Sequence, residues 1–230
     1  FAVAGCQEGA KKEEVKAPVL EAEIQKQAYG LGASIGMYMQ RNLAEHDKLG
    51  LALDKELIVR GFVDSINDKS LIEKEEIQAL LTNLDKTMKA KQQEMAAKAS
   101  EASLAEGQKF LADNAKKEGV MVTESGIQYS VLTASEGDKP AATDTVKVHY
   151  KGTFLNGETF DSSYDRGEPA EFPVGGVIAG WTEALQQMKA GSKWKLFIPY
   201  HLAYGEAGAG ADIGPYQALI FEIELLAIVS

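Results

Sequence analysis

The spacing of apolar residues changes once along this chain, near Gly119, and this change constrains the fold more than any other feature. From Leu20 to about Lys117, apolar residues recur at the spacing of an α-helix. After Gly119 they alternate with polar residues, as in antiparallel strands with one buried face. A chain of 230 residues is long enough for two domains. The sequence therefore predicts a helical region followed by a β-rich domain.

Three helices are predicted in the first part, over residues 24–43, over residues 54–66 and from Ser70 onwards. Ser70 and Glu73 have the spacing of a capping box, so the third helix is expected to begin there. It continues to Lys117 without proline and with Gly107 as its single glycine. At about 1.5 Å per residue it would be a rod of roughly 72 Å. Such a rod is too long for the interior of one compact domain.

The apolar residues of this long helix are dense at first and become sparse after Met95. We expect the dense part to pack against a partner surface and the sparse part to be a mostly solvated strut. The first helix carries the small residues Gly30, Gly32 and Gly36 beside Met37. Glycine costs a helix about 1 kcal/mol, and close packing of another helix would compensate. Packing in a core or a dimer is the favoured interpretation of these residues, and an apolar ligand-binding groove is the alternative.

The part of the chain after Gly119 is predicted to form strands. Alternating apolar residues follow Val146, Trp194 and Phe221, and Asn156-Gly157 is the residue pair favoured in type I′ hairpin turns. One short helix is expected around Trp181. The predicted fold class is α+β: an all-helical dimerisation region with a very long linking helix precedes an antiparallel sheet wrapped around one short helix. The expected domains are a tether over residues 1–19, a helical domain over 20–118 and a β-rich domain over 119–230.

Several classes of function are disfavoured by the composition. A formal charge of −10 argues against a nucleic-acid partner and against electrostatic binding to anionic lipid. No apolar run is long enough to span a bilayer as a helix. His46, His149 and His201 lack the spacing of metal ligands, so no metal site is expected. The glycine-rich stretch after Gly205 does not have dinucleotide-binding spacing, and no nucleophile motif occurs. No cofactor is expected.

The single cysteine, Cys6, follows Val3-Ala4-Gly5 and resembles the lipidated cysteine of a bacterial lipobox. Under that interpretation residues 1–5 are the remnant of a signal peptide, and Cys6 is a lipidation site. The alternative is a chance run of small residues before a free thiol. Under either interpretation the first 19 residues are expected to form a flexible polar tether.

Residues 120–229 carry a set of motifs in one order: Val148-His149-Tyr150, Phe160-Asp161-Ser162-Ser163, Arg166-Gly167, Val177-Ile178-Ala179-Gly180-Trp181, Leu202-Ala203-Tyr204-Gly205 and Leu219-Ile220-Phe221-Glu222. This region resembles the FKBP-type peptidyl-prolyl cis/trans isomerase domain. Residues 20–119 resemble the N-terminal region of the Mip/FkpA-type subgroup of that family, whose members are bacterial, exported and dimeric. Individually, the same residues would pass as core aromatics, a turn acid and a solvated charge.

The resemblance implies a role for each motif residue. Trp181 would form the floor beneath the proline ring of a substrate. The walls would be Tyr150, Phe160, Phe172, Val177, Ile178 and Phe221. The backbone N–H of Ile178 and the hydroxyl of Tyr204 would hold substrate carbonyls. Asp161 would contact the twisted carbonyl or orient Tyr150, restrained by Arg166, which makes Asp161, Tyr204 and Tyr150 the expected catalytic residues.

The segment between Tyr204 and Phe221 departs from the family pattern, in which this loop often carries apolar or proline residues that touch the substrate. Here Ala209 and Asp212 weaken apolar contact, while Ile213 is expected to retain some. The departure bears on substrate preference and on binding of macrolide inhibitors, and it does not bear on the reaction class.

The leading hypothesis is a peptidyl-prolyl isomerase that accelerates the folding of exported proteins, with chaperone activity from the cleft of a homodimer joined through its N-terminal helices. Its partners would be proline-containing unfolded or partly folded polypeptides. It would act in the periplasm of a Gram-negative bacterium, attached to the outer membrane if Cys6 carries lipid. One alternative is a non-catalytic FKBP-like peptide-binding module. The other is a helical scaffold.

Overall fold

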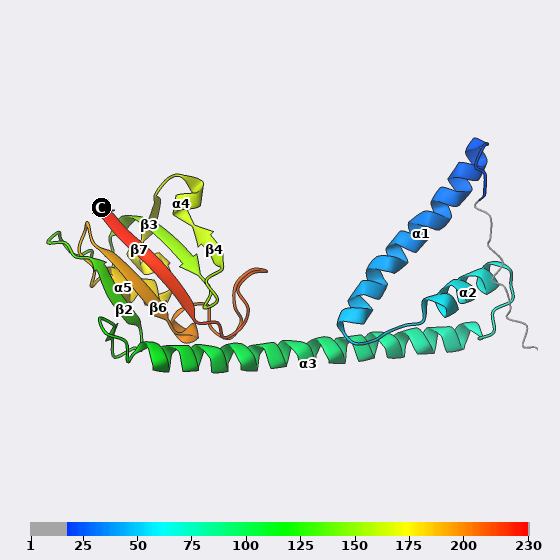
Figure 1. The fold of residues 1–230 in the computed structure, drawn as a ribbon, viewed down its shortest axis with the longest axis horizontal. Helices are drawn as coiled ribbons and strands as arrows, with labels where there is room; N and C mark the ends of the chain where they lie inside the picture. Colours follow the sequence, from blue (N-terminus) through cyan, green and yellow to red (C-terminus); the bar gives the residue numbers. More distant parts are fainter. Residues whose placement is uncertain (1–17, 230) are drawn as a thin grey trace, which may run out of the picture. The chain divides into compact units, whose positions relative to one another are not determined.

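The computed structural model describes residues 18–229, and Cys6 lies outside them. The chain divides into two compact units, one ending at Lys91 and the other beginning at Gln92. Helices make up the first unit, and a sheet with its covering helices makes up the second (Figure 1). Among the described helices, none is both long and apolar enough to cross a bilayer.

The helical unit contains α1, Glu23–Lys48, and α2, Lys55–Ile66. Both helices were predicted, and α1 is nearly two turns longer than expected, mainly at its C-terminal end. Asp54 caps α2, because its carboxylate accepts hydrogen bonds from the backbone N–H groups of Glu56 and Leu57. Leu43 is the one buried apolar side chain among the described residues of this unit.

The long helix α3 spans Lys74–Asn114, 41 residues instead of the predicted 48. The capping box predicted at Ser70 is wrong. The Ser70 hydroxyl lies in the preceding turn, where it donates to the carbonyl of Ile72, and the first backbone bond of the helix runs from Ile77 N to Glu73 O. The serine side chain therefore stabilises the local turn and leaves the helix to begin one turn later.

The second unit is built on a seven-stranded antiparallel sheet in the order β1-β2-β6-β7-β3-β4, with β5 also paired to β3. Its strands are β1 (Met121–Val122), β2 (Gln128–Thr133), β3 (Thr145–Thr153), β4 (Thr159–Ser162), β5 (Ala170–Pro173), β6 (Lys193–Ile198) and β7 (Leu219–Ile228). The short helices are α4 (Ser163–Arg166) and α5 (Ala179–Leu185), with 3-10 turns at Val174–Gly176 and Tyr200–Leu202. The predicted α+β fold class is confirmed.

β3 is the centre of the arrangement, because it pairs with β7 along one side and with β4 and β5 in succession along the other. Its residues Val146, Val148 and Tyr150 are buried at every second position, as predicted. β7 shows the same alternation from Leu219 to Leu225. Helix α5 closes this face of the sheet with Trp181 and Leu185.

The turn between β3 and β4 is not the predicted type I′ turn. That turn needs positive φ at both central residues, but Gly157, at φ 88°, has positive φ and Asn156 does not. The backbone N–H of Gly157 donates to Phe154 O, and Phe154 N donates to Glu158 O. The pair Asn-Gly therefore still makes a tight hairpin, but with the left-handed residue after the turn, as in hairpins that carry a glycine bulge.

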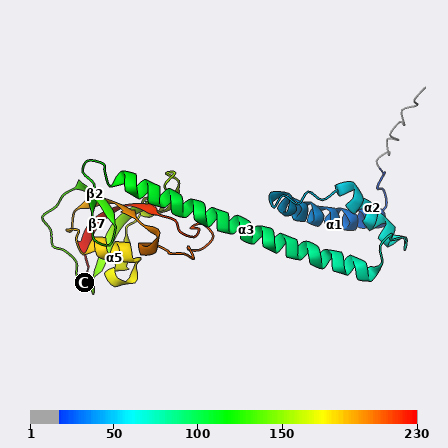
Figure 2. The same ribbon diagram turned by 90° about the horizontal axis from the view of Figure 1, so that it is seen from below.

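The end of α3 covers the other face of the sheet, so the sheet lies between α3 and α5 (Figure 2). Phe110 of α3 packs against Phe197 of β6 with ring centroids 5.9 Å apart. Asn114 donates to the Gln128 side chain at 3.0 Å, and Gln128 donates to the carbonyl of Leu111 at 2.8 Å. The expectation of a mostly solvated strut after Met95 is thus wrong for this last stretch, where α3 is part of the second unit.

Candidate active site

A hollow of about 300 Å³ opens on the face of the sheet that carries α5, and aromatic side chains form most of its wall. Its residues come from the strands β3, β4, β5 and β7, from α5 and the turn before it, and from the segment that follows β6. They are Tyr150, Phe160, Asp161, Phe172, Gly176, Val177, Ile178, Trp181, Tyr204 and Phe221. We call this hollow the aromatic cup.

Trp181 forms the floor of the aromatic cup. Its side chain is 4% exposed. The rings of Tyr150, Phe172 and Phe221 stand nearly perpendicular to the indole, at interplanar angles of 81°, 88° and 85° and centroid distances of 5.2 to 5.8 Å. Edge-to-face contacts of this kind are favoured between aromatic rings. The result is a flat base with upright sides, which fits a small apolar ring.

Two glycines make this packing possible. A Cβ at Gly152 would lie 2.6 Å from the Phe160 ring and 2.8 Å from the Phe221 ring. A Cβ at Gly180, next to Trp181, would lie 2.6 Å from the Ile198 side chain. Because real Cβ atoms do not come so close, any larger residue at either position would displace the wall or the floor of the cup.

Charged groups are confined to one side of the cup. The Tyr150 hydroxyl donates to Asp161 at 2.5 Å, and Arg166 donates both to the other Asp161 oxygen and, at 2.8 Å, to the Tyr150 oxygen. Partial burial disfavours the charged form of Asp161, but the hydrogen bonds from Tyr150 and Arg166 and the charge of Arg166 outweigh it and lower the pKa of this carboxyl. Asp161 is therefore an anion at neutral pH, held in one orientation.

Two hydrogen-bond donors at the cup remain available to a ligand. Tyr204 is 37% exposed, and burial together with the charge of Asp161 raises the pKa of its phenol, so it stays protonated at neutral pH. The backbone N–H of Ile178, at the start of α5, has no acceptor among the residues that the structure describes. An amide carbonyl lying over the cup would find a donor at either position.

The structure brings together nearly all of the residues singled out from the sequence. Ile213 lies outside the cup, in an adjoining hollow that it shares with Phe160, Asp161 and Tyr204. Arg166 does not line the cup either and acts through its bonds to Asp161 and Tyr150. Sequence reasoning missed Gly176 in the lining and Gly152 behind it. A glycine inside an otherwise alternating strand signals close approach, and Gly152 is such a residue.

None of the side chains that line the cup is a serine, cysteine or lysine nucleophile. What the cup offers is an apolar floor, upright rings, one fixed anion and two hydrogen-bond donors. These features define an α+β domain with a site that fits a small apolar ring flanked by amide carbonyls, and with no nucleophilic side chain in its lining.

Comparison with known proteins agrees with this description. Residues 136–226 match the family model of the FKBP-type peptidyl-prolyl cis-trans isomerase, and residues 24–131 match that of the domain amino terminal to it. The FKBP-type peptidyl-prolyl cis-trans isomerase FkpA of Aeromonas hydrophila is 46% identical over 215 residues, covering 93% of this chain and 80% of that protein. The outer membrane protein MIP of Legionella longbeachae is 38% identical over 210 residues, covering 91% and 87%.

Among solved structures, the crystal structure of FkpA from Escherichia coli matches with a TM-score of 0.80 and 42% identity, covering 91% of this chain and 98% of that one. The chain therefore belongs to the family of FKBP-type peptidyl-prolyl cis-trans isomerases and is an enzyme of that family. Its substrates are polypeptides that contain proline.

Proposed function

We propose that this enzyme is a folding catalyst for exported proteins, that it works as a homodimer, and that the aromatic cup lowers the barrier to X-Pro rotation by holding the prolyl ring away from water. The observation that carries the catalytic part is Trp181, buried at the base of three perpendicular rings.

The physical reason lies in the amide itself. Resonance gives the X-Pro bond a barrier of about 18–20 kcal/mol and makes its isomerisation slow enough to limit folding. Twisting the bond interrupts this resonance and reduces the charge separation across it. A surrounding with little water therefore favours the twisted amide over the planar, more polar one. No bond is made or broken, in keeping with a cup that has no nucleophile.

The proposed roles follow the positions of the side chains. The prolyl ring would rest on Trp181, between Tyr150, Phe172 and Phe221. Ile178 N–H and the Tyr204 hydroxyl would hold substrate carbonyls. Asp161, fixed by Tyr150 and Arg166, would lie beside the rotating amide. The bonds around Asp161 favour an orienting role, because both of its oxygens already accept hydrogen bonds.

A peptide assay tests these roles. We expect Tyr204→Phe to lower kcat/KM by about tenfold, the loss for one hydrogen bond to a buried carbonyl. Asp161→Ala should cost more, because it also frees Tyr150 and Arg166. Full activity of both variants on several X-Pro tetrapeptides would overturn the roles assigned here. It would leave the apolar floor to be tested by Trp181→Ala.

The proposed dimer contact lies in the helical unit. Ile24, Leu31, Ile35 and Tyr38 share one face of α1, at a spacing of seven, four and three residues, and are 71%, 67%, 39% and 61% exposed. Apolar faces of this extent on a helix mark contacts with another protein surface. A second copy of the chain would cover them, and two linked cups would raise the effective concentration of one substrate segment at the other site.

The dimer is tested by comparing the full chain with a fragment that begins at Gln92, where the second unit begins. Both should turn over tetrapeptides at the same rate. The fragment should be several-fold slower in refolding a protein limited by prolyl isomerisation, and it should suppress aggregation poorly. If the fragment and the full chain refold the protein at the same rate, the proposed role of the dimer is contradicted.

The proposal also covers location and inhibitors. One relative is named an outer membrane protein, and Cys6, outside the described residues, would carry the lipid anchor in the periplasm. Mass spectrometry of the native N-terminus tests this, because a thioether-linked diacylglycerol has a defined mass. Macrolide inhibitors of the family should compete with peptides for the cup. Asp212, beside Ile213 in the adjoining hollow, should weaken them relative to an Asp212→Ala variant.

A further inference from the structure

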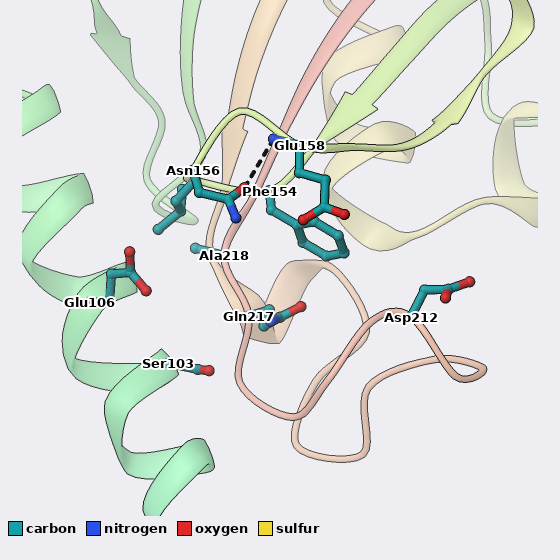
Figure 3. Close-up of a pocket in the computed structure, with 9 residues that line it drawn as sticks. Ser103, Glu106, Phe154, Asn156, Glu158, Asp212, Gln217 and Ala218 are labelled. Carbon is teal, nitrogen blue, oxygen red and sulfur yellow. Dashed lines mark hydrogen bonds between the residues drawn. The ribbon is translucent and has the colours of Figure 1, made fainter. Parts of the chain in front are cut away.

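The turn between β3 and β4 holds the two strands in one register. The side chain of Asn156 accepts the backbone N–H of Glu158 at 2.9 Å and keeps this turn closed (Figure 3). Beyond the turn the strands pair as far as Lys151 and Ser162, where β4 ends and α4 begins. Tyr150 is therefore the first residue of β3 that β4 no longer covers.

Ser163 is the next residue in this register and lies opposite Tyr150. The other partner strand, β5, pairs with β3 only up to Val148, so Tyr150 lies between the two paired segments. The Ser163 hydroxyl accepts the Tyr150 N–H at 2.8 Å and donates to the Tyr150 carbonyl at 3.2 Å. Ser163 is fully buried. One side chain thus satisfies both backbone groups that a strand would otherwise pair.

The same hydroxyl has a third contact, with His149, whose Nδ1 lies 3.0 Å from it. A hydroxyl has one proton and two lone pairs, so with its proton on the Tyr150 carbonyl it accepts from the Tyr150 amide and from Nδ1. The His149 ring stacks on Tyr164 of α4 at 4.6 Å, and Tyr164 donates to Glu224 of β7 at 3.1 Å. The first two residues of α4 are therefore both held to the sheet.

The placement of α4 matters because Arg166 is its last residue. Arg166 donates to Asp161 and, at 2.8 Å, to the Tyr150 hydroxyl, which itself donates to Asp161. Ser163 holds the backbone of one donor to Asp161 and lies on the same short helix as the other. Both donors to this carboxylate are thus connected to one buried hydroxyl.

We infer that Ser163 is a positioning residue of the isomerase, and that its hydroxyl keeps Tyr150 and Arg166 aligned on Asp161. It does not line the aromatic cup, so it acts through these residues and not on the substrate. This inference rests on the proposed role of Asp161. It adds that the geometry of the charged side of the cup is set by a hydroxyl behind its wall.

Ser163→Ala in the full chain is the first test. We expect kcat/KM on X-Pro tetrapeptides, corrected for the folded fraction, to fall by about tenfold, the effect of losing one buried hydrogen bond. The loss should lie in kcat, because the floor and walls of the cup remain. Ser163→Cys has a similar volume but is a weak donor and acceptor. It should show a smaller loss in the same direction, and it replaces the alanine variant if that protein does not fold.

A double-mutant comparison separates positioning from a general loss of structure. In an Asp161→Ala background, either Ser163 variant should cost less than about twofold, because the group that the hydroxyl positions is gone. Ser192→Ala is the control. Ser192 is also buried, its hydroxyl has no partner among the described residues, and it does not line the cup, so its loss should leave kcat/KM unchanged.

Two results would overturn the inference: no loss of activity when Ser163 alone is changed, or the same fold loss with and without Asp161. Full activity of the Asp161→Ala chain is a different failure, because it contradicts the proposed role of Asp161 itself. The four proteins of the comparison therefore show which of the two proposals fails.

Discussion

The two units of this chain differ in where their apolar side chains lie. In the unit that begins at Gln92, apolar side chains of β3, β6, β7 and α5 are buried in one core. In the described part of the other unit, Leu43 is the one buried apolar side chain, and α1 and α2 expose apolar residues such as Leu31, Tyr38 and Leu57. Exposed apolar surface of this extent is typical of sites that contact another protein surface. One unit thus carries the whole aromatic cup, while the other carries the apolar surface on which the proposed dimer depends.

The largest effect is expected in the unit with the core. Trp181→Ala removes the floor of the aromatic cup and leaves a cavity, and changes of this size cost about 3–5 kcal/mol of unfolding free energy. Isomerase activity on tetrapeptides should fall with it. Trp181→Phe serves as the control, since it keeps an aromatic floor and should be affected less. Denaturant unfolding and the peptide assay measure the two effects separately. An alanine variant with unchanged activity would contradict the role of the cup.

In the other unit, a single change should break assembly and leave catalysis intact. Leu31→Glu places a charge on the exposed apolar face of α1, where an interface would have to bury it. We expect the dimer dissociation constant to rise by about 100-fold or more, measured by sedimentation, with tetrapeptide turnover unchanged. Gln40→Glu adds the same charge to an exposed position on the opposite side of α1, nine residues from Leu31, and is the control. Loss of peptide activity in the Leu31 variant would mean that the two units are not independent.

A third prediction concerns the residue at which the second unit begins. A fragment that begins at Gly119 loses Phe110, Leu111 and Asn114, and leaves Gln128 without its partners. An unpaired buried polar group costs about 1–3 kcal/mol. We therefore expect this fragment to unfold at lower denaturant than the fragment that begins at Gln92. Equal unfolding free energies would place the natural boundary at the change of apolar spacing and not inside α3.

The sequence predicted the structure correctly where residues close together in the chain determine it. Alternation in β3 and β7 predicted the buried face, and the ordered motifs predicted the residues of the cup. It did not predict burial or contacts that depend on a segment far away in the chain. Phe197 occupies an outward position of β6, and it is buried because the end of α3 packs on it. Gly107 and Asn114 look unremarkable in a helical pattern, yet their close contacts are with Ala218 and Gln128.

The turn at Asn156-Gly157 was placed correctly but given the wrong geometry, because the dipeptide fits more than one hairpin type and the flanking bonds of Phe154 select between them.

The smallest predicted effect is the response of the catalytic unit to acid. Hydrogen bonds from Tyr150 and Arg166 outweigh partial burial and keep the pKa of Asp161 below its ordinary value of about 3.9. A carboxyl with a lowered pKa in the folded state stabilises the protein above its unfolded-state pKa, and this contribution is lost as the pH falls through the folded-state value. We expect kcat/KM to be independent of pH between about 5 and 8 and to fall only below about pH 4. Asp161→Asn should have lower activity without the acidic limb, whereas a wild-type profile that bends near pH 6 would show that another group controls the reaction.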